Sequence, residues 1–260
     1  TGVQTCALPI LLAITRKQAI KKLLQEQKSV TISDLSERLN VTKETIRRDL
    51  RAMEKDQELI RTHGGAYILE GVQNDLDVTT RQALRITEKE IIAQKCDALI
   101  QPSDIIFLDS STTSWYIARK IVNRKLTVVT TSLEIANILS RSSTVHLFLT
   151  GGEFSARTKG FTGNGTVRSL QQYFFDKAFV SCRSVCMEFG VTDINEDSAM
   201  LYKIALQHAH QKFLVVDHTK LDKTSFSAVI PLEKMDAIIT DCEFSSEWKE
   251  WLTKNSVQYY

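Results

Sequence analysis

Between residues 105 and 239, six short apolar segments recur, and most of them are followed by a stretch with helical character. Each segment is a nearly unbroken run of branched and aromatic residues, without the alternation of a strand that faces water on one side. Such strands, separated by helices, are typical of a parallel sheet covered on both faces. The strands are expected at residues 105–108, 126–129, 145–149, 177–180, 213–216 and 237–239.

Polar residues follow several of these strands, at the edge where parallel sheets bind ligands. The first strand leads into a hydroxyl-rich turn at a helix start, where backbone amides and the helix dipole favour a phosphate group. Ordinary capping by Ser and Thr is the alternative, but two further polar strand ends and a lysine favour a small anionic ligand. The residues expected to contact it are Asp109, Ser110, Ser111, Thr112, Thr113, Thr131, Ser132, Gly151, Gly152 and Lys220.

A separate basic helix is expected from Thr42 onward. Ile46, Leu50 and Met53 fall on one helical face, and Thr42 is a good N-cap. Lys43, Arg47 and Arg51 lie on another stripe of the helix, with Arg48 beside them. Such a stripe is typical of a helix that enters the DNA major groove. A solvated charged surface is the alternative interpretation.

The flanking segments favour DNA binding. A short helix at residues 33–40 precedes the basic helix through a tight connection, which is a helix-turn-helix arrangement. Residues 58–69 are expected to form two strands around Gly64–Gly65, the wing of a winged helix, and residues 29–32 a strand that pairs with it. For His63, a turn without DNA contact is the alternative. The residues expected to contact DNA are Thr42, Lys43, Thr45, Arg47, Arg48, Arg61 and His63.

The distribution of charge agrees with two functional parts. Residues 15–67 hold 12 Lys and Arg against 8 Asp and Glu, a net charge of +4, whereas the whole chain is +2 and the remainder is therefore −2. A basic module on a larger, slightly acidic body suits a nucleic-acid reader joined to a regulatory domain. No apolar run reaches membrane-spanning length, so no membrane association is expected.

The five cysteines are scattered, which predicts buried reduced thiols in a cytoplasmic protein rather than disulfides. Cys182 and Cys186 lack a second pair at zinc-site spacing, so neither a metal nor a cofactor is expected. Residues 1–11 are interpreted as a disordered or foreign leader. The expected domains are residues 12–69 for DNA binding and 88–260 for effector sensing, joined by a linker at 70–87.

Both parts resemble one family, the DeoR-type bacterial transcriptional regulators. The reader carries that family's signature in residues 45–50 and 61–66, and the body resembles the family's sensor domain at residues 108–113, 129–132, 151–152 and 217–220. The resemblance implies a winged helix-turn-helix joined to a Rossmann-like domain similar to phosphosugar isomerases. It also implies a repressor of sugar or polyol genes, controlled on its double-stranded operator DNA by a phosphorylated sugar or related metabolite.

Some positions depart from the family's usual pattern. A serine, Ser110 or Ser111, replaces a glycine in the first sensor loop, and Ser198 and Tyr202 stand where an acid and a lysine are usual. No convincing acid–base pair for catalysis is visible, so the chain is not expected to be an enzyme. A sugar-phosphate isomerase with a DNA-binding appendage is the alternative, and an architectural DNA-binding protein is a third. Because one short helix reads few base pairs, a homo-oligomer is expected.

Overall fold

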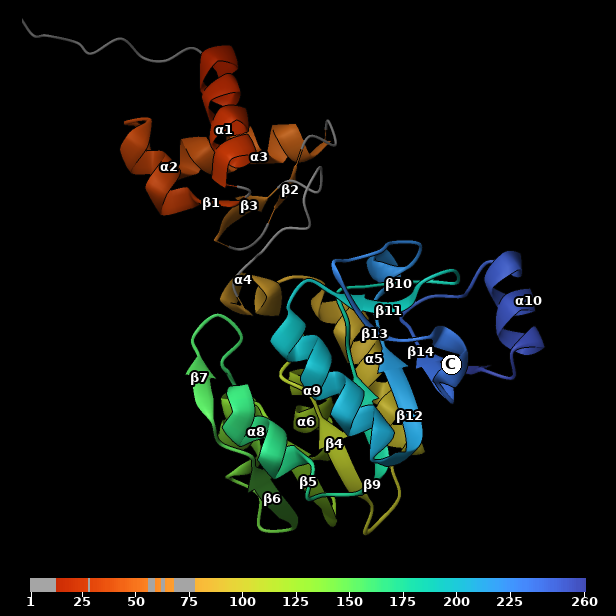
Figure 1. The fold of residues 1–260 in the computed structure, drawn as a ribbon. Coiled ribbons are helices and arrows are strands. Elements are labelled where there is room, and N and C mark those ends of the chain that lie inside the picture. The colour runs from red at the N-terminus through yellow and green to blue at the C-terminus, as the bar shows by residue number, and fades with distance from the viewer. Residues whose placement is uncertain (1–12, 28, 56–58, 62–63, 68–77) are drawn as a thin grey trace, which may run out of the picture. The chain divides into compact units, whose positions relative to one another are not determined.

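The computed structural model describes residues 13–27, 29–55, 59–61, 64–67 and 78–260, and the predicted leader lies outside these ranges. The chain separates into two compact units, residues 1–76 and 77–260 (Figure 1). Across the described ranges, no helix combines the length and apolar character needed to cross a bilayer.

The first unit packs helices against a small antiparallel sheet. Its strand order is β1-β3-β2. Residues 60–61 pair with 66–67, and residues 29–31 pair with 65–67, so the predicted hairpin and its predicted partner strand are both confirmed. The elements are α1 (Ala13–Gln27), β1 (Ser29–Thr31), α2 (Ile32–Arg38), α3 (Lys43–Lys55), β2 (Ile60–Arg61) and β3 (Gly65–Tyr67).

The core of the first unit is built from the residues that the helical spacing places inward. Ile46, Leu50 and Met53 on α3 are each at most 1% exposed, so the predicted inward face is confirmed. Gly65 is required where β3 crosses β1, because an added Cβ would lie 1.9 Å from the carbonyl oxygen of Val30. The close approach of these strands therefore depends on a residue without a side chain.

The second unit is organised around a seven-stranded parallel sheet, with the order β15-β14-β12-β9-β4-β5-β6. All six predicted strands belong to it, which confirms the predicted fold class. The strands are β4 (Ile105–Leu108), β5 (Leu126–Thr130), β6 (Val145–Leu149), β9 (Phe175–Val180), β12 (Ala209–Val215), β14 (Ala237–Ile239) and β15 (Gln258–Tyr259).

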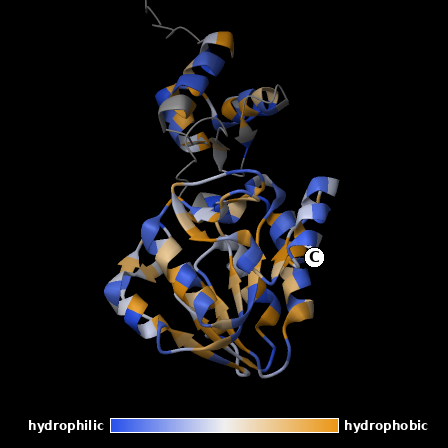
Figure 2. Cartoon of the chain, turned by 45° about the vertical axis from the view of Figure 1, so that its right-hand side comes forward, coloured by the Kyte–Doolittle hydropathy of each residue, from blue (hydrophilic) through white to orange (hydrophobic). Residues whose placement is uncertain are grey.

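Helices cover both faces of this sheet, which explains why its strands are apolar throughout. Ile106 and Leu108 pack with α5, α6 and α7, whereas Phe107 between them packs with α8, α9 and α10 on the other face. Figure 2 shows hydrophobic residues gathered on the central strands. The helices are α4 (Val78–Ala83), α5 (Ile86–Leu99), α6 (Thr112–Ile121), α7 (Leu133–Leu139), α8 (Gly163–Leu170), α9 (Glu196–Gln207) and α10 (Ser246–Lys254).

Two small antiparallel sheets, which the sequence did not predict, flank the parallel one. One pairs β7 with β8, and the other has the order β10-β11-β13. Their strands are short and lack long apolar runs. They are β7 (Glu153–Ser155), β8 (Gly160–Thr162), β10 (Ser184–Cys186), β11 (Gly190–Asp193) and β13 (Ser227–Ile230).

Several sequence-based expectations are wrong in detail. Residues 78–83, inside the predicted linker, form α4, and Val78 is 1% exposed in the core of the second unit. On α5, the apolar residue Ile91 is 39% exposed, because the buried face of this helix comprises Lys89, Ile92, Ala93 and Cys96. Cys96 and Cys182 are buried as expected, but Cys186 is half-buried and Cys242 is exposed.

Candidate nucleic-acid interface and effector site

The start of α3 presents polar and cationic side chains from a capped helix. The Thr42 hydroxyl accepts a hydrogen bond from the Thr45 amide at 3.2 Å, which is the predicted N-cap, and the two hydroxyls lie 2.9 Å apart. Lys43 and Arg48 are exposed. The first turn of α3 therefore combines fixed hydroxyl groups with cations that solvent reaches.

Glu44 holds two arginines of α3 at the surface. Its carboxylate lies 3.1 Å from Arg47 and 3.8 Å from Arg51, and all three side chains are about half exposed or more. Exposed ion pairs of this kind are weak, so an approaching phosphate can compete for these arginines. Among the described residues, Arg48 has no ion-pair partner.

Arg16 and Asp49 form a buried ion pair that sequence reasoning missed. Both side chains are about 5% exposed or less, and Arg16 donates two hydrogen bonds to the carboxylate, one of them at 3.1 Å. The hydrogen bond to Asp49 raises the pKa of Arg16. The pair ties α1 to α3 and fixes how α3 presents its outer face. Nothing in the sequence pairs two residues that lie 33 positions apart.

The predicted wing contributes Arg61 and His63. Arg61 lies against α3, since its side chain is 3.5 Å from the carboxylate of Glu54 and its amide donates to the same carboxylate at 3.3 Å. His63 lies outside the described residues.

In the second unit, Asp109 organises the turn between β4 and α6. Its side chain is fully buried and accepts hydrogen bonds from the Ser111 amide at 3.0 Å, the Ser181 amide at 2.7 Å and the Ser114 hydroxyl. Burial raises the pKa of Asp109, and these hydrogen bonds oppose that rise. Because Asp109 does not reach solvent, it positions the neighbouring residues of the turn and does not itself offer a group to a ligand.

The start of α6 has the features of an anion site. Ser111 caps the helix by accepting from the Ser114 amide at 3.1 Å, and the first turn leaves the Thr112 and Thr113 amides without intrahelical partners. The side chains of Thr112 and Thr113 are 5% and 1% exposed, whereas Ser110 is half-buried. The turn therefore offers backbone amides, with Ser110 as the accessible hydroxyl.

Lys220 is connected to this turn through Ser181. Its Nζ donates to the Ser181 hydroxyl at 2.8 Å, and the Ser181 amide donates to Asp109. These residues follow β12, β9 and β4, which are neighbours in the sheet. The structure thus brings the predicted lysine to the predicted hydroxyl-rich turn. Ser181 was missed, although it directly follows the predicted strand at 177–180.

Asp217 partly balances the charge of Lys220. Burial would raise the pKa of Asp217, but Lys220, the hydrogen bond from Thr219 and Arg85 together outweigh burial and lower it. The Nε atom of Arg85 lies 3.8 Å from the Asp217 carboxylate. One carboxylate at the end of β12 therefore faces cations from two elements.

Thr131 and Ser132 follow β5 and are almost completely buried. Ser132 caps α7 and accepts a hydrogen bond from the Trp115 indole at 3.1 Å, so its hydroxyl is already used within the protein. The Thr131 carbonyl accepts from the Phe161 amide at 2.8 Å. Gly160 then packs beside the β4 turn, because an added Cβ would lie 2.8 Å from the Cβ of Ser110.

Gly151 and Gly152, after β6, have the φ angles of +64° and +119° that favour glycine. An added Cβ on Gly152 would lie 2.0 Å from the Thr166 hydroxyl. In the order β12-β9-β4-β5-β6, four strand spacings, or roughly 19 Å, separate the end of β6 from that of β12. One small ligand does not span both Lys220 and these glycines.

Two further residues near the turn, Tyr202 and Lys89, were not predicted as site residues. Burial raises the pKa of the Tyr202 phenol well above its usual value, and Asp109 and Asp193 add to that rise. Tyr202 is therefore a neutral group where the family usually has lysine. Lys89 is 4% exposed, and burial, followed by Lys220, lowers its pKa to about 7. In the sequence, a lysine at helical spacing from the apolar residues Ile92 and Cys96 could have identified Lys89 as a buried charged residue.

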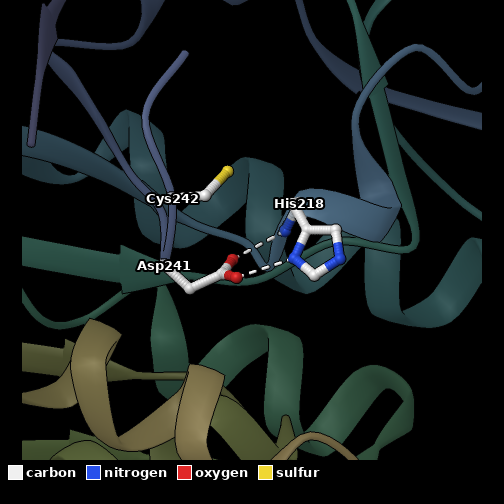
Figure 3. Close-up of side chains that lie close together, drawn as sticks. All are labelled: His218, Asp241 and Cys242. Carbon is white, nitrogen blue, oxygen red and sulfur yellow. Dashed lines mark hydrogen bonds and ion pairs between the residues drawn. The ribbon is translucent and has the colours of Figure 1, made fainter.

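His218, Asp241 and Cys242 gather at the ends of β12 and β14, with potential ligand atoms within 4.8 Å of one another (Figure 3). Asp241 accepts from the His218 amide and pairs with the His218 Nδ1, both at 2.7 Å. Figure 3 shows the Cys242 sulfur directed away from this pair. The hydrogen bonds between His218, after β12, and Asp241, after β14, explain why these two side chains lie together.

Comparison with known proteins assigns both units. The DeoR-like helix-turn-helix domain matches residues 16–72, and the DeoR C terminal sensor domain matches residues 84–242. The transcriptional regulator YulB of Bacillus subtilis (strain 168) is 34% identical over 89% of this chain and 90% of its own length. The lactose phosphotransferase system repressor of Lactococcus lactis subsp. lactis is 34% identical over 91% and 95%, respectively. The repressor GlcR of Bacillus subtilis (strain 168) is 30% identical over 94% of each.

Among solved structures, ribose 5-phosphate isomerase A of Methanocaldococcus jannaschii is similar at a TM-score of 0.39, with 18% identity over 51% of this chain and 53% of the isomerase. That distant likeness does not bear on activity. The relatives matched over most of their length are regulators, which decides against the isomerase alternative. The chain belongs to the DeoR family of transcriptional regulators and is not an enzyme.

Proposed function

We propose that the chain is a cytoplasmic repressor of sugar or polyol genes, and that a phosphorylated sugar controls its binding to operator DNA. Residues 12–69 would bind DNA and residues 88–260 would sense the effector. The name of one relative, a lactose phosphotransferase system repressor, supports the link to sugar metabolism, and GlcR is likewise a transcriptional repressor.

The observation that carries the effector proposal is the hydrogen-bonded connection from Lys220 through Ser181 to Asp109. It joins a cation to a helix start, and together they offer one positive charge and several amide donors to a phosphate group. The phosphate would lie at residues 110–113, with Lys220 beside it. Thr131, Ser132, Gly151 and Gly152 would shape the neighbouring strand ends: the first two are buried, and the glycines lie too far from Lys220 to contact the same group.

The DNA proposal rests on the capped, cationic start of α3. Thr42, Lys43, Thr45, Arg47 and Arg48 would face the major groove, and Arg61 and His63 would approach the backbone from the wing. A homo-oligomer would present two such helices to two half-sites about one helical turn of DNA apart. Light scattering combined with footprinting tests this, and a monomer that protects one isolated half-site would contradict it.

Calorimetry with a panel of phosphorylated and unphosphorylated sugars tests the effector site. The parent should bind a phosphorylated sugar, and Lys220→Gln should bind it at least about tenfold more weakly, because one charge-assisted hydrogen bond is lost. Lys223→Gln is the matched control: Lys223 is exposed, lies three residues further on, and donates to the Thr219 carbonyl. Equal affinity of both variants and the parent would place the phosphate elsewhere.

A further inference from the structure

Lys89 occupies a position where the periodicity of α5 calls for an apolar residue. The buried face of this helix comprises Lys89, Ile92, Ala93 and Cys96, and Lys89 itself is 4% exposed. Burying an ammonium group is unfavourable unless hydrogen bonds replace water. Its Nζ donates to two backbone carbonyl oxygens, those of Arg81 and Leu84. The side chain therefore has a specific structural role at the start of α5.

Both carbonyls belong to the end of α4 and its connection to α5. The last carbonyls of a helix lack regular intrahelical partners. The Arg81 carbonyl also accepts from the Leu84 amide at 3.3 Å, and Lys89 adds a donor to it and one to the Leu84 carbonyl. At its other end, α4 is held by the buried side chain of Val78 and by a hydrogen bond from the Val78 amide to the Arg157 carbonyl at 3.3 Å. α4 is the first element of the second unit, so it is the first helix after the DNA-binding unit in the chain.

Lys89 also senses the charges of the effector site. The pKa of Lys89 is lowered to about 7, mainly by burial and next by Lys220; Asp217 opposes this lowering, and Arg81 and Glu88 make smaller contributions of opposite sign. Asp217 also faces Arg85 at 3.8 Å. Arg85 joins α4 to α5 in a left-handed conformation, with a φ of +51°. Asp217 thus acts on Lys89, Arg85 and Lys220, of which Arg85 also pairs with Glu88 at 3.6 Å. A bound anion would relieve the repulsion between Lys89 and Lys220.

We propose that Lys89 couples the effector site to α4: an anion bound beside Lys220 strengthens the hold of the Lys89 ammonium on the Arg81 and Leu84 carbonyls. This inference rests on the proposed effector site. It adds how a ligand bound there affects α4, the helix that follows the DNA-binding unit in the chain. A fully charged ammonium donates stronger hydrogen bonds than a neutral amine. A bound anion would therefore stabilise the α4–α5 connection. A ligand shifts the equilibrium between two conformations only if it stabilises one of them more than the other.

Hydrogen–deuterium exchange with inorganic phosphate as the probe tests the coupling on the full chain. In the parent, phosphate should slow exchange in a peptide covering residues 78–89 at least about fivefold, the lower end of typical coupling. Lys89→Met should abolish that slowing, whereas Lys89→Arg, which keeps the charge, should retain part of it. Lys95→Met is the matched control, because Lys95 lies on the same helix and donates to the Thr240 carbonyl at 2.8 Å; it should respond like the parent.

Calorimetry on the same samples separates the two proposals. If phosphate binds neither the parent nor Lys95→Met, the effector site itself is wrong and the coupling falls with it. If phosphate binds the parent without slowing exchange at 78–89, or slows it equally in Lys89→Met, the site stands and the coupling is overturned. Should Lys89→Met fail to fold, the response of the parent and of Lys89→Arg still decides, since coupling requires slowing in the parent.

Discussion

The Arg16 guanidinium and the Asp49 carboxylate meet inside the reader, where both side chains are about 5% exposed or less. They join α1 to α3, the helix whose cations we propose to face DNA. A second acid–base pair of the same unit, Asp34 with Arg38, is joined at 2.7 Å but lies at the surface. The two pairs have similar chemistry and differ in burial, so they make a matched comparison.

We expect Arg16→Met to destabilise the first unit by about 3–5 kcal/mol, because it leaves the buried Asp49 carboxylate unpaired. Arg38→Met should change its stability by less than about 1 kcal/mol, as exposed pairs contribute little. Urea unfolding monitored by hydrogen exchange in α1 and α3 measures both values. A similar decrease in the free energy of unfolding of both variants would show that the buried Arg16–Asp49 pair stabilises the unit no more than an exposed pair does.

Gly65→Ala and Gly64→Ala should differ sharply although the residues are adjacent. An added Cβ at Gly65 meets the Val30 carbonyl at 1.9 Å, whereas at Gly64 nothing lies within 4 Å. Gly65→Ala should therefore separate β3 from β1 and destabilise the first unit by roughly 1–3 kcal/mol or more. Gly64→Ala should remain within about 0.5 kcal/mol. Thermal unfolding of both variants would contradict this if their midpoints were equally lowered.

Arg48→Ala should weaken DNA binding through the loss of one exposed cation on α3. If Arg48 reads a base, the loss should be about 1–3 kcal/mol and restricted to the operator; if it contacts a phosphate, all sequences should weaken alike and the salt slope should fall by about one. Lys120→Ala, at an exposed cation on α6, is the control. Fluorescence anisotropy at several salt concentrations measures both, and equal affinity of Arg48→Ala and Lys120→Ala would remove Arg48 from the interface.

The pH dependence of stability should report Lys89. Its pKa is about 7 in the folded chain and 10.5 for an ordinary lysine, so between these values the unfolded chain binds the additional proton. The free energy of unfolding contributed by this group should therefore rise from pH 7 to about pH 10 and stay constant below pH 7. Lys89→Met should lack that rise, and urea denaturation at pH 6, 7.5 and 9 compares the two proteins. Parallel curves would mean that Lys89 keeps an ordinary pKa.

Much of the fold follows from periodicity. The inward face of α3 and the six apolar strands of the parallel sheet are local patterns, and the structure confirms them. Apolar character alone would place Ile91 inward, but Lys89 lies on the buried face of α5 and Ile91 lies outside that face. α4 was missed because one buried residue, Val78, holds it in the core, and a six-residue helix is too short to show a period.

The candidate site was predictable where a polar residue directly follows an apolar strand. Asp109 was found in this way and Ser181 could have been, whereas Lys220 belongs to the polar stretch 217–220 after the strand at 213–216. The connection from Lys220 through Ser181 to Asp109 required the strand order, which places the ends of β12, β9 and β4 side by side. The Arg16–Asp49 pair and the position of Tyr202 depend on contacts between distant segments, which the sequence of one chain does not encode in any local pattern.

Release of operator DNA by a phosphorylated sugar tests the central claim most directly. Anisotropy of labelled operator bound to the full chain would be followed while phosphorylated and unphosphorylated sugars are added at constant ionic strength. We predict that one phosphorylated sugar changes operator affinity at least about fivefold, that its unphosphorylated form does not, and that Lys220→Gln loses the response while Lys223→Gln keeps it. Unchanged affinity across the panel, or an equal response to unphosphorylated sugars, would contradict a phosphate-sensing regulator.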